Sequence, residues 1–239
     1  MSLTNNKIPL AIVAVFSLCL GTQSLMAFPV CGSEIKKKCF TGKFQLSEIL
    51  AEKKNRTLDS DFGYIDSNGV GWEAKQGSAT DGASIPKLFQ PFIGTPWEES
   101  YIRAAVIHDW YCDHNVYPWR ETHKVFYEIM IESGVPVRKA KLMFYAVYAF
   151  GPKWGYTSPG STCSVTKNCI QTKDSVFVKI GDKYSDENNI PELKAMEASI
   201  DIAESKGGYD LDQLAEIAEK AHPTQDLYES AIKGGALTK

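Results

Sequence analysis

The chain lacks several patterns that would assign a function directly. No two cysteines stand at the C-x-x-C spacing, no G-x-S-x-G segment is present, and acidic residues (29) outnumber basic ones (26). The first absence argues against a cysteine-rich zinc module, and the second argues against the nucleophile turn of an α/β-hydrolase. The net charge of −3 argues against a general nucleic-acid-binding protein.

A long apolar segment is also missing, since a membrane-spanning helix needs about 20 apolar residues and the N-terminal run at 8–20 is shorter. This run follows a basic residue, Lys7, and precedes a polar stretch that ends at the small residue Ala27. That order is typical of a secretory signal peptide. We therefore expect residues 1–27 to be cleaved, and a mature protein from Phe28 that is periplasmic or secreted and has no membrane span.

The cysteines fit an exported protein. Five of them follow the predicted signal peptide: Cys31, Cys39, Cys112, Cys163 and Cys169. In an oxidising compartment, the close spacing of the first two and of the last two predicts two short disulfide loops. Cys112 is then left without a partner.

Local patterns divide the middle of the chain between a sheet and helices. Residues 62–74 hold two apolar segments around an Asp-Ser-Asn-Gly turn, which predicts an antiparallel hairpin. Residues 77–96, rich in Gly, Pro and Ser, predict a long ordered loop. Helical spacing of apolar residues and cap residues predicts three central helices. They run from Thr95 to about Tyr111, from near Pro118 to before Gly134, and from after Pro136 to Gly151.

The C-terminal part is mainly helical. A strand-like run at 175–180 is followed by three short amphipathic helices. These are expected at 192–204, 211–221 and 226–232. The fold class is therefore α+β: a small antiparallel sheet with a long loop packed on three central helices. A main domain at 28–184 carries a helical C-terminal extension at 185–239, which we expect to cap the main domain rather than to bind a partner.

Polar residues in unusual surroundings gather in the middle of the chain. Three of the four histidines fall between positions 108 and 123. His108 lies among apolar residues of the first central helix, where an imidazole needs a polar partner. Asp109 adjoins it, His123 lies on the second helix, and the long loop contributes Asp81 and Ser84. These five residues are the candidate site.

The motif D-G-A-S-I-P at 81–86, followed by A-V-I-H-D-W-Y at 105–111, resembles a family found in phages and bacteria, domain of unknown function 1353. The resemblance covers roughly residues 63–154. Family members usually carry aspartate three residues before Phe126, where this chain has His123. Aspartate and histidine share the ability to bind a divalent metal, so the exchange fits a ligand position better than a salt bridge.

Three arrangements of these residues would give chemistry. In the first, His108 and His123 project from facing helices toward one divalent metal, zinc or manganese, with Asp109 or Asp81 as a third ligand or as the group that activates water. In the second, Ser84 is a nucleophile, His108 is its base, and Asp81 or Asp109 orients His108. In the third, a reactive thiol at Cys112 pairs with His108 or His114.

A fourth arrangement is structural. Asp81, Ser84 and His108 would then hold the loop on the helices, and Asp109 would pair with Arg103 or Arg120. We expect a metal-dependent hydrolase that acts on a cell-envelope polymer such as peptidoglycan. The alternative is an exported binding or inhibitor protein, whose partner is another exported protein and whose polar cluster is structural.

Overall fold

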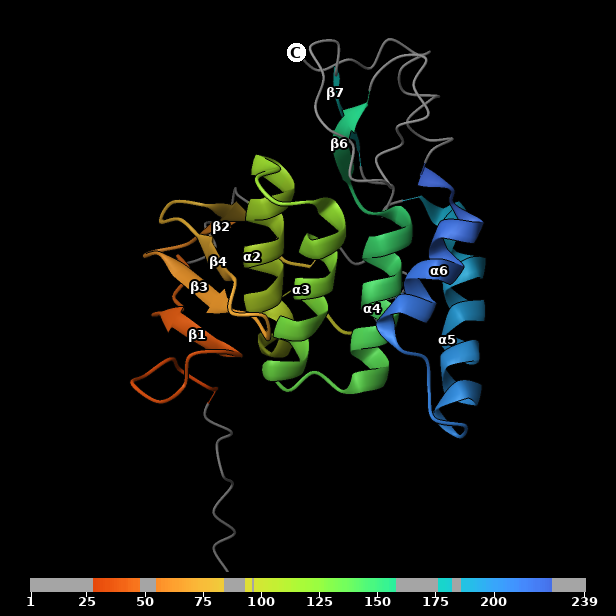
Figure 1. Cartoon of the computed structure of the whole chain (residues 1–239), viewed down its shortest axis with the longest axis horizontal. Helices are drawn as coiled ribbons and strands as arrows, with labels where there is room; N and C mark the ends of the chain where they lie inside the picture. The colour runs from red at the N-terminus through yellow and green to blue at the C-terminus, as the bar shows by residue number, and fades with distance from the viewer. Residues whose placement is uncertain are drawn as a thin grey trace, which may run out of the picture.

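The computed structural model describes residues 28–47, 55–83, 93–95, 97–157, 176–181 and 186–224. Figure 1 shows small strands at one side, helices α2, α3 and α4 in the middle, and α5 and α6 at the other side. The architecture is α+β, as predicted. No helix within these described ranges is long and apolar enough to cross a membrane.

The main sheet has three antiparallel strands in the order β1 (Cys39–Gly42), β3 (Phe62–Ile65) and β4 (Gly71–Ala74). The predicted hairpin is confirmed, and Asp66 shapes its turn by accepting hydrogen bonds from the backbone N–H groups of Asn68 and Val70. Its second carboxylate oxygen accepts from the indole of Trp72 at 3.0 Å. The sheet faces α2, where the Trp72 ring packs against Tyr111.

Two short strands, β2 (Arg56–Thr57) and β5 (Ala79–Thr80), pair antiparallel, and β5 contacts α2. A third sheet follows α4, where β6 (Lys153–Thr157) pairs antiparallel with β7 (Val176–Ile180), as the strand-like run at 175–180 predicted. The predicted disulfide between Cys31 and Cys39 is present. The predicted pair Cys163 and Cys169 and the helix expected at 226–232 lie outside the described residues.

The central helices are α2 (Glu99–His114), α3 (Trp119–Glu132) and α4 (Val137–Phe150). The predicted bounds of α3 and α4 are confirmed, since each follows a proline and Gly134 turns the chain between them with φ +83°. The predicted bounds of α2 are wrong at both ends. Its helical geometry starts after Glu98 and continues beyond Tyr111 until Asn115, whose left-handed conformation (φ 56°) ends the helix.

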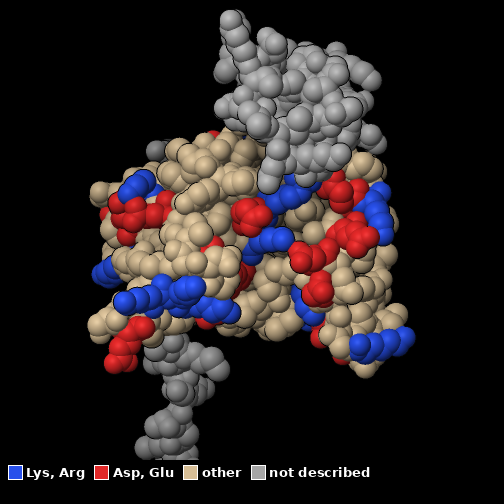
Figure 2. Space-filling model, viewed as in Figure 1, with Lys and Arg blue, Asp and Glu red and all other residues tan. Residues whose placement is uncertain are grey.

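The C-terminal helices, α5 (Ile190–Glu204) and α6 (Leu211–Ala221), follow a short 3-10 turn η1 (Glu187–Asn189) and pack on α4. Their buried apolar side chains join the core of the central helices: Leu193, Met196, Ile200, Leu214, Ala215 and Ala218. Ion pairs add to this packing, for example Lys141 with Glu204 at 2.6 Å. In Figure 2, basic and acidic side chains lie next to one another on the face that carries these helices.

Candidate metal centre

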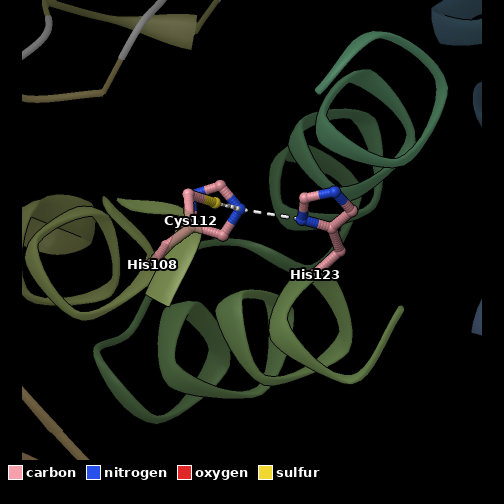
Figure 3. A group of neighbouring side chains, drawn as sticks. All are labelled: His108, Cys112 and His123. Atoms are coloured by element: carbon pink, nitrogen blue, oxygen red, sulfur yellow. Dashed lines mark hydrogen bonds between the residues drawn. The ribbon is translucent and has the colours of Figure 1, made fainter. Parts of the chain in front are cut away.

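The two histidines predicted to converge meet between α2 and α3. The Nε2 atom of His108 lies 2.8 Å from the Nδ1 atom of His123. Figure 3 shows the two rings pointing toward one another from their separate helices. Both are buried, with 6% and 0% of their surfaces exposed. The apolar context of His108 therefore did require a polar partner, and that partner is a second imidazole.

Hydrogen bonding fixes which nitrogen of His123 carries the proton. Its Nε2 atom lies 3.2 Å from the carbonyl oxygen of Pro152, which can only accept a hydrogen bond. Nε2 is therefore the protonated nitrogen, and the lone pair of Nδ1 faces His108. His108 in turn donates through Nε2 to that lone pair.

Cys112 brings a third donor atom to the same place. It lies one helical turn after His108, because α2 continues to His114, and its Sγ atom is 3.6 Å from His108 Nε2. The side chains of His108, Cys112 and His123 each offer one ligand atom, and these atoms all lie within 4.8 Å of one another. The thiol was expected as a reactive partner of His108 and was missed as a third ligand. The spacing of four residues on one helix was the signal that could have found it.

Two of the distances between these donor atoms can be compared with those of a tetrahedral zinc site. Bonds of about 2.05 Å to nitrogen and 2.3 Å to sulfur in tetrahedral geometry separate the two nitrogens by about 3.3 Å and sulfur from nitrogen by about 3.6 Å. The distance from Cys112 Sγ to His108 Nε2 already has this value. The two imidazole nitrogens would have to separate by about 0.5 Å, within the reach of small side-chain rotations.

Asp109 lies beside this group, on the far side of the His108 ring. Its Oδ1 atom is 3.9 Å from His108 Nδ1, and its Oδ2 atom accepts a hydrogen bond of 2.6 Å from the hydroxyl of Thr80. Arg120, one of the predicted partners of Asp109, binds Glu219. Asp109 thus faces the opposite nitrogen of His108 from His123, and does not join the three converging donors.

A pocket of about 310 Å³ opens beside these residues. His108, Cys112 and Asp109 contribute to its wall, together with Asp81, Asp113 and the side chain of Lys179. Lys179 donates to the carbonyl oxygen of Cys112 at 2.6 Å. The structure therefore brings four of the predicted site residues together at or next to the pocket: Asp81, His108, Asp109 and His123. The fifth, Ser84, lies outside the described residues.

Burial and neighbouring charges shift the pKa values of the two imidazoles in opposite directions. Burial disfavours a charged ring at His108, but the Cys112 sulfur and the Asp109 carboxylate outweigh burial and raise the pKa of His108 to about 10. Burial, together with the charges of His108 and Lys153, holds the pKa of His123 well below its usual value. His123 is therefore the neutral ring, in agreement with the hydrogen bond that its Nδ1 lone pair accepts from His108.

Comparison with known proteins supports the resemblance in the central segment. Residues 56–147 match the family described as "Protein of unknown function (DUF1353)". The chain is 49% identical over 227 residues to the "Uncharacterized protein y4iH" of Sinorhizobium fredii, which covers 94% of this chain and 95% of that protein. The chain belongs to the DUF1353 family.

The family match starts and ends seven residues earlier than the expected segment of 63–154. It includes the three converging donors and Asp109, whereas α5 and α6 lie beyond it. A second protein of the same organism, "Uncharacterized protein y4jT", is 45% identical over 97 residues, which are 41% of this chain and 29% of that protein. No solved structure matches this DUF1353 member.

Proposed function

We propose that this protein is a metal-dependent hydrolase. The observation that carries the proposal is the convergence of His108 Nε2, His123 Nδ1 and Cys112 Sγ beside a pocket of about 310 Å³. Three protein ligands beside an accessible space are typical of catalytic zinc sites, which keep one coordination position for water or substrate. A structural zinc site would instead use four protein ligands.

The donor set favours zinc over manganese, because thiolate and imidazole are preferred zinc ligands and manganese prefers oxygen. A zinc ion at these residues would polarise a substrate carbonyl and lower the pKa of a water molecule. The chain itself supplies carboxylates on the pocket wall, at Asp81 and Asp109, for proton transfer to and from the substrate. His123 would hold its lone pair in place through the hydrogen bond to Pro152.

The proposed location is the periplasm or the exterior of the cell, on the basis of the predicted signal peptide. The proposed substrate is a cell-envelope polymer such as peptidoglycan. Export places the protein beside that polymer, and the resemblance to a family of phages and bacteria agrees with a substrate that both encounter.

A second candidate is an exported binding or inhibitor protein in which the histidine pair is structural. The observation that favours it is the hydrogen bond from His108 to His123, two rings that are both buried. In this case the pair would stabilise the contact between α2 and α3 without a metal ion.

The test is hydrolysis of purified peptidoglycan by the zinc-loaded protein, followed by chromatography of the released fragments. We expect release by the unchanged protein and a loss of at least about 100-fold in His108→Ala and Cys112→Ser, the scale on which removal of catalytic groups acts. His114→Ala is the matched control, since this histidine is exposed on the same helix. Absence of release from the metal-loaded protein would contradict this function and favour the binding protein.

A further inference from the structure

The hydroxyl of Thr80 has a fixed direction. Thr80 is 3% exposed at the end of β5, and its Oγ1 atom accepts a hydrogen bond of 3.0 Å from the backbone N–H of Gly82. The hydroxyl proton is therefore free to point elsewhere, and it points to Oδ2 of Asp109 at 2.6 Å. An ionised carboxylate can only accept a hydrogen bond. The backbone N–H of Gly82 therefore donates to Thr80, and the hydroxyl of Thr80 donates to Asp109.

This contact holds the carboxylate of Asp109 between the strand and the helix. With Oδ2 bound to Thr80, the other oxygen, Oδ1, faces Nδ1 of His108 at 3.9 Å. A shift of about 1 Å would bring these two atoms to hydrogen-bond distance. The side chain of Asp109 is 27% exposed, so it is held in place at the rim of the pocket rather than within the core.

We propose that Thr80 and Asp109 are a positioning pair that orients His108 for metal binding. The inference rests on the proposed metal centre. A metal at Nε2 of His108 requires the ring proton on Nδ1, and that proton needs an acceptor. Asp109 Oδ1 is placed to accept it, just as the carbonyl of Pro152 accepts from the outer nitrogen of His123. Each imidazole thus has an acceptor on the side away from the shared centre, the arrangement that fixes metal-bound histidines in proteins.

The chain offers a matched control for this pair. Thr224 is 1% exposed, and its hydroxyl donates to the carboxylate of Glu219 at 2.7 Å. Glu219 also binds Arg120. Thr224→Val therefore removes the same kind of hydrogen bond as Thr80→Val, at a carboxylate that binds an arginine.

The experiment measures the zinc affinity of the purified full-length protein by competition with a chromogenic chelator. Thr80→Val should weaken zinc binding by about 10-fold, and Asp109→Asn by about 10- to 100-fold, the range found for groups that hold metal ligands. Asp109→Asn should weaken binding because the hydroxyl of Thr80 would still donate to the amide oxygen of the new side chain. The NH₂ group, a donor, would then face His108 Nδ1 in place of the carboxylate oxygen that accepts its proton. Thr80→Ser, which keeps the hydroxyl, and Thr224→Val should bind zinc like the unchanged protein.

A second readout is the protonation of His108 in the zinc-loaded protein, from NMR spectra of ¹⁵N-labelled histidine. Nδ1 should carry the proton in the unchanged protein and in Thr80→Ser. If the unchanged protein binds zinc and folded Thr80→Val and Asp109→Asn bind it equally tightly, the positioning pair is refuted while the metal centre stands. If the unchanged protein binds no zinc, the proposed function itself fails. If Thr80→Val does not fold, the zinc affinity of Asp109→Asn, a nearly isosteric change, tests the positioning pair by itself.

Discussion

The Nε2 atom of His108 lies 2.8 Å from the Nδ1 atom of His123, across the interface between α2 and α3 and 15 residues apart in the chain. The two helices are joined by a short connection after Asn115, so residues near the end of one face residues near the start of the next. Because Cys112 lies one turn after His108, its sulfur reaches the same place. Helix geometry alone thus brings three side chains with potential metal-ligand atoms to one interface.

Replacement of His123 by aspartate should preserve part of the metal binding. The carboxylate of aspartate can replace an imidazole as a zinc ligand, although its side chain is shorter. His123→Asp should retain bound metal at lower affinity, whereas His123→Leu should lose it. Metal analysis of both folded variants is the measurement. Equal metal content in His123→Leu and the unchanged protein would exclude this histidine as a ligand.

The convergence of His108, His123 and Cys112 could be predicted from the sequence only in part. Apolar surroundings made His108 an unusual histidine, and the two predicted helices allowed His108 and His123 to face each other. The role of Cys112 depended on how far α2 extends, and its predicted end at Tyr111 left the thiol just beyond the helix. Asn115 after His114 was the signal that could have placed this end, since asparagine adopts the left-handed conformation more readily than most residues and often follows the last turn of a helix.

Contacts between distant segments were the least predictable part. The hydrogen bond from Thr80 to Asp109 joins a short strand to α2, and no local pattern at either residue indicates it. The hairpin at 62–74 and the bounds of α3 and α4 were predictable because turn residues, prolines and Gly134 mark them in the sequence.

Glu128→Ala should destabilise the protein. The carboxylate of Glu128, on α3, accepts hydrogen bonds from the hydroxyl of Tyr64 and from the backbone N–H and hydroxyl of Ser67. It therefore fastens the β3–β4 hairpin to the central helices. We expect the free energy of unfolding to fall by about 1–3 kcal/mol, measured by urea denaturation. Glu121→Ala, at an exposed position of the same helix, is the control and should change it by at most about 0.5 kcal/mol. An equal loss of unfolding free energy in Glu128→Ala and Glu121→Ala would show that the hydrogen bonds of Glu128 to the hairpin do not stabilise the fold.

The protein should lose stability in alkaline solution. Burial raises the pKa of several tyrosines above its ordinary value. They are Tyr64, Tyr101, Tyr111, Tyr127, Tyr145 and Tyr148. Because the pKa of each tyrosine is higher in the folded than in the unfolded protein, its contribution to stability is fully present below the unfolded pKa of about 10. This contribution is lost as the pH rises above that value. Tyrosinate absorbance and circular dichroism should therefore change together above about pH 10. Full ionisation of these tyrosines in a protein that keeps its fold would contradict this prediction.

The disulfide between Cys31 and Cys39 should stabilise the N-terminal segment against unfolding. Its closed loop is short, with a sequence separation of 8, so the double variant Cys31→Ser/Cys39→Ser should lose about 2–3 kcal/mol. The measurement is denaturant unfolding with and without a reducing agent. The reducing agent should lower the stability of the unchanged protein toward that of the double variant. Equal stability of the unchanged protein and the double variant in the absence of the reducing agent would refute a stabilising role for this bond.

The most direct test of the metal centre is the metal content of the purified protein, measured beside a His108→Ala/His123→Ala double variant prepared in the same way. We predict close to one zinc ion per chain in the unchanged protein, either as purified or after zinc is added, and none in the folded variant. Absence of bound metal in the unchanged protein after addition of zinc or manganese would contradict the account and leave the histidine pair as a structural contact between α2 and α3.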